Sequence, residues 1–228
     1  NISLIDKKSA MTMVEDPDMV KIVKEISANQ SKITETIVGK TDVKLIGDRA
    51  VVRTGESNLA DLLTDAMLWK TGADIALTNG GGIRSSIDVG DITRGEVIQV
   101  LPFGNYVIVQ ELTGADVIAA LENGTAGYPS QHGAFSQVAG IKYSFDPSKP
   151  VGQRIVSVTM ANGESIDKNK TYKVATNDFI AAGGDLYVMF KGKKVIGNYE
   201  GLDEILTAYI ASGAKAKDGV DGRVKVIN

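Results

Sequence analysis

Three arginines in two short motifs could hold an anion. Arg49 and Arg53 lie four residues apart, just ahead of a predicted helix N-terminus, and Arg84 follows Asn79 and the glycine run that ends at Gly82. A guanidinium donates two parallel hydrogen bonds to a phosphate or carboxylate, a helix N-terminus favours anions, and glycine lets the backbone approach a ligand closely. The motifs therefore predict an anion site, or else surface arginines beside a tight turn that needs positive φ angles.

Two phenylalanines lie in polar, glycine-bearing loops rather than in apolar strands. Phe103 occurs in Pro-Phe-Gly-Asn and Phe179 in Asn-Asp-Phe-Ile-Ala-Ala-Gly-Gly-Asp. A base stacked on an aromatic ring gains about 1–3 kcal/mol, whereas a phenylalanine buried in the core would only anchor its loop, which is the more frequent outcome. If a base binds, Asn105 could bond to its edge and Asp185 could accept from sugar hydroxyls. The loops thus predict either a base platform or two core anchors.

The remaining reactive side chains form no catalytic pattern. The sequence has no cysteine and a single histidine, His132, in a polar stretch. A dinuclear metal site or an imidazole triad is very hard to build with one imidazole, so we expect His132 to be a surface or loop residue. The acid pairs Asp61 with Asp65 and Asp203 with Glu204 fall on predicted helices. We expect these carboxylates to be solvated charges or to complement a helix dipole.

Hydrophobic periodicity and punctuation by glycine predict the elements that carry these motifs. We expect helices over 16–31, from a cap at Ser57 or Asn58 to just before Gly72, from a capping box at 113–116 to Gly124, and over 202–211. Strands are predicted over 36–38, 42–46, 75–78, 96–101, 106–112, 141–145, 154–160 and 172–176.

The interleaving of helices with hairpins and single strands predicts a mixed α/β (α+β) fold. We expect a single compact domain with mixed β-sheets and flanking helices over residues 36–228. An N-terminal segment that contains a linker helix is predicted over 1–35.

Bulk composition limits the classes of function. The 228 residues are 43% hydrophobic and 23% charged, which is typical of a folded globular chain and excludes general disorder. The formal net charge is −3 with interspersed signs, so a polymeric nucleic acid is not an expected partner. No apolar run approaches the roughly 20 residues of a membrane-spanning helix, and we expect no membrane span.

Four motifs in this order together resemble the C-terminal domain of the 5'-nucleotidase family, over roughly residues 36–191. They are Arg-x3-Arg-x-Gly-Glu-x-Asn, Asn-Gly-Gly-Gly-Ile-Arg, Pro-Phe-Gly-Asn and Asn-Asp-Phe-x3-Gly-Gly-Asp. The resemblance implies that the arginines hold the phosphate of a nucleotide in a pocket shaped by Asn79 and the glycines. It also implies that Phe103 and Phe179 enclose the base, and that Asn105 bonds to the base and Asp185 to the ribose. Gly140 falls where the family has a glycine near the base pocket.

The resemblance also implies the chemistry of the whole protein. In this family an N-terminal metallophosphoesterase domain holds divalent metal ions, and a metal-activated water attacks the phosphorus of a nucleoside phosphate. This sequence lacks those ligand motifs, so we expect it to bind a nucleoside or nucleotide, to hold no metal and to be inactive alone. The family implies an extracellular, periplasmic or wall-attached location. A related phosphoester (a 2',3'-cyclic or 3'-nucleotide, or a nucleotide sugar) and a non-catalytic nucleotide-binding module are the alternatives.

Overall fold

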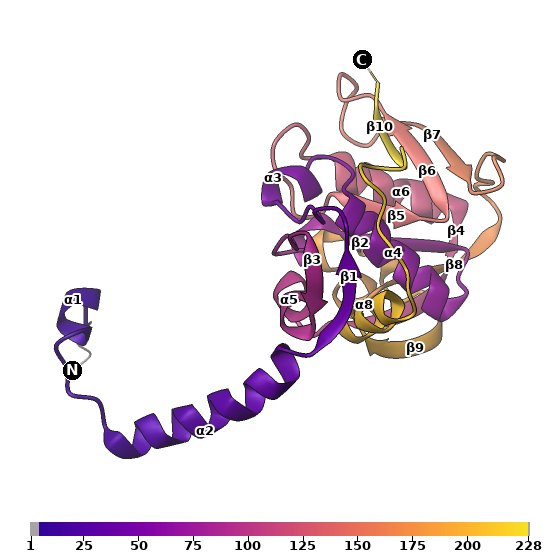
Figure 1. Cartoon of the computed structure of the whole chain (residues 1–228). Coiled ribbons are helices and arrows are strands. Elements are labelled where there is room, and N and C mark those ends of the chain that lie inside the picture. Colours follow the sequence, from indigo (N-terminus) through magenta and orange to yellow (C-terminus); the bar gives the residue numbers. More distant parts are fainter. Residues whose placement is uncertain (1–4, 228) are drawn as a thin grey trace.

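A computed structural model describes residues 5–227, in which a mixed α/β body carries a projecting helix (Figure 1). The α-helices are α1 (Lys7–Ala10), α2 (Pro17–Thr34), α3 (Arg49–Val52), α4 (Asn58–Thr71), α5 (Arg94–Val100), α6 (Gly114–Thr125), α7 (Asp178–Ala181) and α8 (Leu202–Ala211). Short 3-10 turns are η1 (Gly80–Gly82), η2 (Gly184–Leu186) and η3 (Val188–Phe190).

The strands form three sheets. The central sheet has the order β5 (Ser136–Ala139), β2 (Ile75–Asn79), β8 (Thr171–Asn177), β4 (Tyr106–Thr113) and β9 (Val195–Gly201). Among the neighbouring strands of this sheet within residues 5–227, β2 and β8 are the only parallel pair. A second sheet contains β10 (Val224–Val226), β6 (Ile141–Phe145) and β7 (Ile155–Met160), and a third pairs β1 (Ile37–Thr41) with β3 (Gly90–Thr93). The predicted mixed fold is therefore confirmed.

The middle strands β2 and β8 of the central sheet are buried on both faces. Along β2, Ala76 belongs to one hydrophobic cluster, whereas Ile75 and Leu77 belong to another. Val174 and Ala175 in β8 divide in the same way. Because neighbouring residues of a strand point to opposite faces, each cluster covers one side of the sheet. Because side chains pack against both faces of these strands, the sheet is a rigid support for the loops at its ends.

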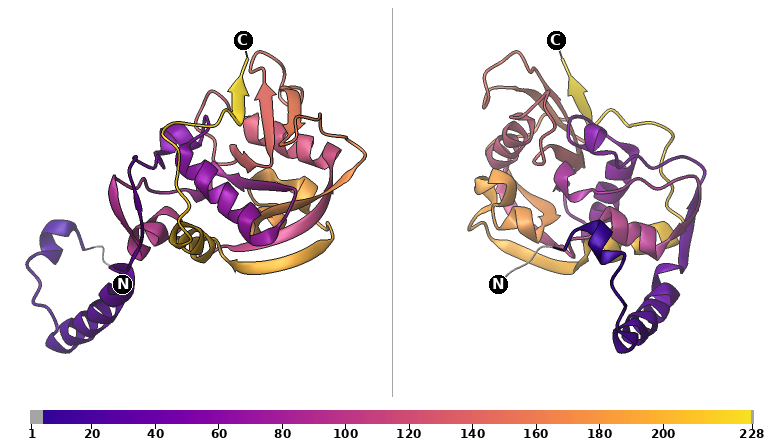
Figure 2. Two further views of the ribbon diagram at one scale, coloured as in Figure 1. Left: turned by 45° about the vertical axis from the view of Figure 1, so that its right-hand side comes forward. Right: turned by 90° about the vertical axis from the view of Figure 1, so that its left-hand side faces the viewer.

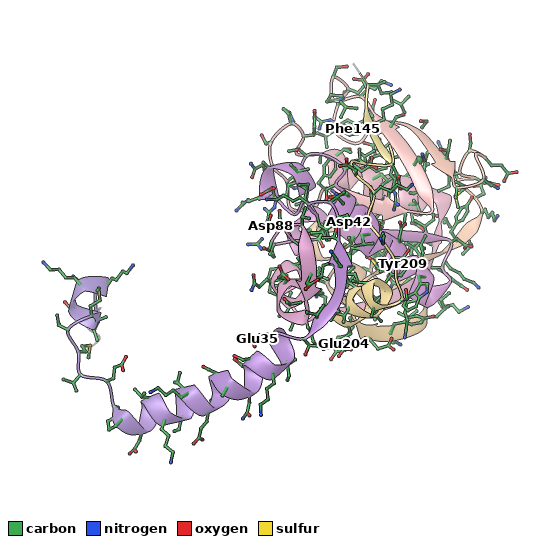
Figure 3. All side chains as sticks on the ribbon, viewed as in Figure 1. Glu35, Asp42, Asp88, Phe145, Glu204 and Tyr209 are labelled. Carbon is green, nitrogen blue, oxygen red and sulfur yellow. The ribbon has the colours of Figure 1, made fainter. Side chains whose placement is uncertain are left out.

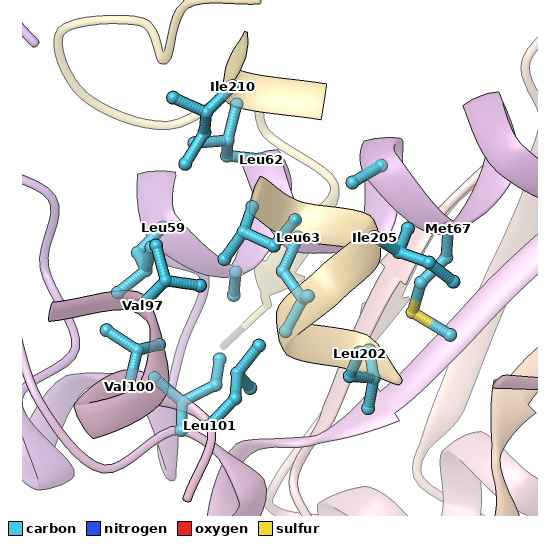
Figure 4. Packing of buried hydrophobic residues seen from close by; sticks show 14 of the residues in the cluster. Leu59, Leu62, Leu63, Met67, Val97, Val100, Leu101, Leu202, Ile205 and Ile210 are labelled. Atoms are coloured by element: carbon cyan, nitrogen blue, oxygen red, sulfur yellow. The ribbon is translucent and has the colours of Figure 1, made fainter. Parts of the chain in front are cut away.

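Helix α4 packs on the first face together with α5 and α8. Its N-terminus is capped by Ser57, whose Oγ accepts from the Ala60 amide at 3.1 Å, and its C-terminus ends at Gly72 in a left-handed conformation with φ 61°. Apolar side chains of α4 face α5 and α8 (Figure 4). The predicted helix from the 57–58 cap to Gly72 is thus confirmed, as are the helix opened by Thr113 and the helix over 202–211.

Two predicted strands are wrong. Residues 96–101 mostly belong to helix α5, which Thr93 and Glu96 open with a reciprocal capping box: the Glu96 amide donates to Thr93 Oγ1 at 3.2 Å, and the Thr93 amide donates to Glu96 Oε2 at 2.8 Å. A short apolar run does not distinguish a buried helix from a strand, and the cap decides here. Residues 42–46 form only an isolated bridge between Leu45 and Ile87.

Helix α2 extends away from the body. Asp16 caps it, Pro17 occupies its first turn, and none of its residues is buried. Most of its length stands clear of the body, and only its last turn, at Thr34, lies against Gly95 of α5 before the chain passes Glu35 into the fold (Figure 3). Both views of Figure 2 place α2 outside the body and the C-terminus at the opposite end. No helix within residues 5–227 combines the length and apolarity that a membrane span requires. The helix is confirmed, and the division at residues 35 and 36 stays a prediction.

Candidate functional site

The predicted motifs meet at one end of the central sheet. Strands β2 and β8 are parallel and end at Asn79 and Asn177, so η1 and α7 follow at the same edge. The loop before β4 and the loop before β5 reach this edge because both strands are antiparallel to their neighbours. Together they enclose a pocket of about 390 Å³, lined by Arg53, Asn79, Gly81, Gly82, Arg84, Phe103, Asn105, Gly133, Phe179 and Asp185. The pocket contains every predicted site residue except Arg49 and Gly140.

Arg53 is a buried cation without an acidic partner. The residue is only 9% exposed, and its Nε has no hydrogen-bond partner. Within residues 5–227 no carboxylate oxygen lies within 4.0 Å of it. Burial, followed by the charges of Arg49 and Arg84, lowers the pKa of Arg53, while Asp185 opposes this shift. The structure therefore gathers positive charge at the pocket, although Arg49 itself is exposed on α3 and does not line it.

The two phenylalanines are not core anchors. Phe103 is 60% exposed and Phe179 is 44% exposed, so the alternative of buried loop anchors is wrong for both. The Arg84 guanidinium lies 5.7 Å from the Phe103 ring centre, within range of a cation–π contact. The backbone at Gly184 passes under the Phe179 ring, where a Cβ would lie 2.5 Å from ring carbons. Both rings remain free to contact a ligand.

A chain of amides orients Asp185. Asn177 Nδ2 donates to Asn79 Oδ1 at 3.2 Å, and Asn79 Nδ2 donates in turn to Asp185 Oδ2 at 2.8 Å. Asn123 Nδ2 donates to the Asp185 carbonyl at 3.0 Å. Asp185 and Leu186 have φ angles of 48° and 65°, a conformation that costs a non-glycine residue on the order of 1 kcal/mol. The site thus holds this carboxylate in place against a backbone preference.

Some residues at the pocket were not predicted. Gly133 lies opposite Gly81, whose amide donates to the Gly133 carbonyl at 2.7 Å. A Cβ at Gly81 would lie 3.0 Å from that carbonyl oxygen, so the two backbones need this close approach. His132 lies in a loop, as predicted, and is half-buried; its amide donates to the Arg53 carbonyl at 3.2 Å. No local pattern distinguishes Gly133 from other glycines of the polar stretch.

Gly140 does not belong to this pocket. Strand β5 is antiparallel to β2, so Ser136 lies opposite Asn79 at the pocket end, whereas Ala139 lies opposite Ala76. Gly140 follows Ala139 and has φ 79°, and a Cβ there would lie 2.2 Å from the Asp74 carbonyl oxygen. The structure assigns Gly140 to the turn between β5 and β6, and its predicted place near the base pocket is wrong.

A second charged cluster lies apart from the pocket. Arg223 Nη2 is 2.8 Å from Asp65 Oδ2 and 3.0 Å from Asp221 Oδ2, and its Nε is 3.4 Å from Asp61 Oδ1. Asp61 is 7% exposed, and its burial raises its pKa to about 7. The alternative that Asp61 is a solvated charge is therefore wrong, whereas its place in the first turn of α4 fits the alternative of a carboxylate that complements the helix dipole. Within residues 5–227, no group of three or more His, Cys, Asp or Glu side chains is arranged to hold a metal ion.

Known proteins provide an independent comparison. The family model described as the 5'-nucleotidase C-terminal domain matches residues 37–192. The chain is 41% identical over 223 residues to the trifunctional nucleotide phosphoesterase protein YfkN of Bacillus subtilis, covering 93% of this chain and 15% of that protein. It is 35% identical over 199 residues to the protein UshA of Escherichia coli, covering 87% and 35%.

A solved structure agrees with these sequence relatives. The 5'-nucleotidase precursor from Thermus thermophilus superposes with a TM-score of 0.86 at 39% identity, covering 94% of this chain and 44% of that one. The chain therefore spans less than half the length of each of these relatives. The family match, the relatives and the arrangement of the four motifs show that the chain belongs to the 5'-nucleotidase family, as its C-terminal domain.

Proposed function

We propose that this chain is the nucleotide-binding and specificity domain of a metal-dependent 5'-nucleotidase, which hydrolyses nucleoside phosphates to nucleoside and phosphate. The observation that carries the proposal is Arg53, a cation that is 9% exposed and has no carboxylate within 4.0 Å in the described part of the chain. It belongs to a pocket that also presents two exposed phenylalanine rings. A pocket of about 390 Å³ falls within the range of small-molecule sites.

The phosphate is assigned to the arginines. Removing a cation from water is costly unless an anion or hydrogen-bond acceptors replace the water. Among residues 5–227 no carboxylate lies within 4.0 Å of Arg53, only the more distant charge of Asp185 acts on it, and Arg84 adds a second cation to the same pocket. Arg49 contributes positive charge at longer range from α3. A bound phosphate group would complete these guanidinium groups through charge-assisted hydrogen bonds.

The nucleoside is assigned to the aromatic side of the pocket. Phe103 and Phe179 expose their rings next to Asn105, which can bond to a base edge. Asp185 uses Oδ2 to accept from Asn79, which leaves its second oxygen for ribose hydroxyls. A ligand with an anionic end, a polar sugar and a flat apolar ring matches these three surfaces.

The hydrolytic step is assigned to a further domain. The described residues offer no metal cluster, so they do not fit the divalent ions that the family implies, and relatives of this chain are more than twice as long. We therefore expect that the metals lie in a metallophosphoesterase domain outside this chain and that this chain alone does not turn over nucleotides. An extracellular, periplasmic or wall-attached location belongs to the same proposal.

Calorimetric titration with adenosine, AMP and inorganic phosphate tests the proposal. Phe179→Ala should weaken adenosine binding about tenfold, in line with the stacking energy of one base, and should leave phosphate binding within about twofold. Trp69→Ala is the control, because Trp69 is 50% exposed and lies outside the pocket. Equal losses for adenosine and phosphate, or no adenosine binding by the wild type, would contradict the assignment. Metal-dependent release of phosphate from AMP by this chain would contradict the placement of catalysis.

A further inference from the structure

We infer that Asp178 is a positioning residue that turns the amide oxygen of Asn105 toward the ligand, so that the pocket selects bases which present an N–H donor. The inference rests on the proposed function, because it assumes that the base lies against Asn105. Compared with the proposed function, the inference names one more residue, Asp178, which does not line the pocket. It also states that the pocket presents a hydrogen-bond acceptor to the base.

The orientation follows from one short contact. Asn105 Nδ2 lies 2.7 Å from Asp178 Oδ1. A carboxylate accepts hydrogen bonds and cannot donate them, so the amide nitrogen of Asn105 must face Asp178. A flipped amide would bring two oxygens together at this distance and lose a charge-assisted hydrogen bond. The oxygen of Asn105 therefore points away from Asp178 and is the atom left for a ligand.

Asp178 is itself held in place. It opens α7, directly after the cap residue Asn177, and the same Oδ1 accepts from the Phe179 amide at 2.9 Å. One carboxylate oxygen thus joins the backbone of the Phe179 platform to the side chain that reads the base edge.

Asn105 is also held through its backbone. Its carbonyl accepts from the Leu202 amide at 2.8 Å, at the start of α8, and the preceding Gly104 adopts φ 64° to bring the loop back to β4. Because both the main chain and the side chain are bound, the amide cannot turn without breaking its contact with Asp178. Asn105 therefore acts as a fixed acceptor rather than as an amide that adapts to either polarity.

A fixed acceptor has a defined chemical preference. It accepts from an exocyclic amino group such as that of adenine, or from a ring N–H. Purine riboside has the same fused ring and the same sugar as adenosine, but it carries no amino group and no N–H on its pairing edge. Stacking and sugar contacts should therefore be nearly equal for the two nucleosides, and only the contact to Asn105 should differ.

The test is the ratio of dissociation constants for purine riboside and adenosine, measured by calorimetry on the whole chain. The wild type should bind adenosine about tenfold more tightly. Asp178→Ala should reduce this ratio to less than about twofold, because it removes the acceptor that holds the Asn105 amide nitrogen and so allows Asn105 to flip. A purely structural role of Asp178 would weaken both ligands equally and keep the ratio near tenfold.

Asn105→Ala provides the second variant, since it removes the reading group and leaves Asp178 and α7 intact. It should also bring the ratio close to one. A wild-type ratio near one, or a ratio that stays near tenfold in Asp178→Ala or in Asn105→Ala, would overturn the inference. Failure of the wild type to bind either nucleoside would instead overturn the proposed function, so the two failures are distinguishable.

Discussion

Arg53 and Arg223 are equally buried and have opposite surroundings. Their exposed fractions are 9% and 8%. Arg223 contacts three carboxylates, from Asp61, Asp65 and Asp221, whereas Arg53 has none within 4.0 Å among residues 5–227. Since a buried cation is stable only when its charge is compensated, the difference separates two roles. Arg223 is compensated by the fold, whereas the proposed function assigns the compensation of Arg53 to a bound phosphate.

The cluster around Arg223 joins the end of the chain to the body. Asp61 and Asp65 belong to α4, and Asp221 and Arg223 belong to the segment that leads into β10. Glu56 adds to this joint, because its carboxylate accepts from the amides of Asp221 and Val224 at 2.8 and 2.9 Å. The cluster therefore stabilises the fold, and it lies outside the pocket that contains Arg53.

Replacing each arginine with methionine gives the largest expected contrast. Arg223→Met should lower the free energy of unfolding by about 3–5 kcal/mol, because it leaves three carboxylates close together without their cation. Arg53→Met should change it by no more than about 1 kcal/mol, because no protein partner loses its bond. Urea denaturation of both variants measures the two values. Similar losses for both would show that Arg53 has a structural role that the contacts do not explain.

Arg53 should matter little for stability but strongly for the affinity for AMP. Arg53→Gln should weaken AMP binding by about 10- to 100-fold, the equivalent of one or two charge-assisted hydrogen bonds, and should change adenosine binding much less. Arg94→Gln serves as the control, because Arg94 lies in α5 near Glu204 and does not line the pocket. Titration with AMP and adenosine measures both effects. An equal loss for the two ligands would remove the phosphate assignment from Arg53.

The contrast also shows what a sequence can predict. Arg53, Arg84, Phe103 and Asp185 lie in short motifs, and each motif contains the glycines or caps that shape its own loop. Their approach at one sheet edge follows from strands that end together, and the family resemblance placed them on one ligand. Local chemistry and strand order therefore sufficed for most of this site.

Long-range pairing could not be predicted in the same way. Asp61 and Arg223 are 162 residues apart, and nothing near either residue distinguishes it from a solvated surface charge. Gly140 shows the opposite error, in which a residue is assigned to the site although it lies elsewhere. Its position in the sequence suggested a place near the base pocket, but its φ of 79° serves a turn at the other end of β5. The strand predicted over 96–101 was wrong because a short apolar run fits both the helix and the strand period. Only the cap at Thr93 shows that the segment is a helix.

A smaller expected effect is a pH dependence of stability that arises from the cluster around Arg223. Three carboxylates surround one guanidinium, and burial raises the pKa of Asp61 to about 7 from an ordinary 3.8. Between these values the folded state keeps a proton that the unfolded state releases. The stability that Asp61 contributes is therefore fully present below about pH 4 and is lost as the pH rises through about 7.

Asp61→Asn removes this titration and keeps a side chain of nearly the same shape. Between pH 5 and 7 (set by the shifted pKa of Asp61), the unfolding free energy of the wild type should fall relative to the variant by up to about 1.4 kcal/mol per pH unit. Urea denaturation across this range measures the difference. Parallel curves would mean that Arg223 keeps Asp61 ionised in the fold, and the cluster would then be a balanced ion network. Curves whose separation changes with pH in this way would show instead that the folded state binds a proton at Asp61 that the unfolded state releases.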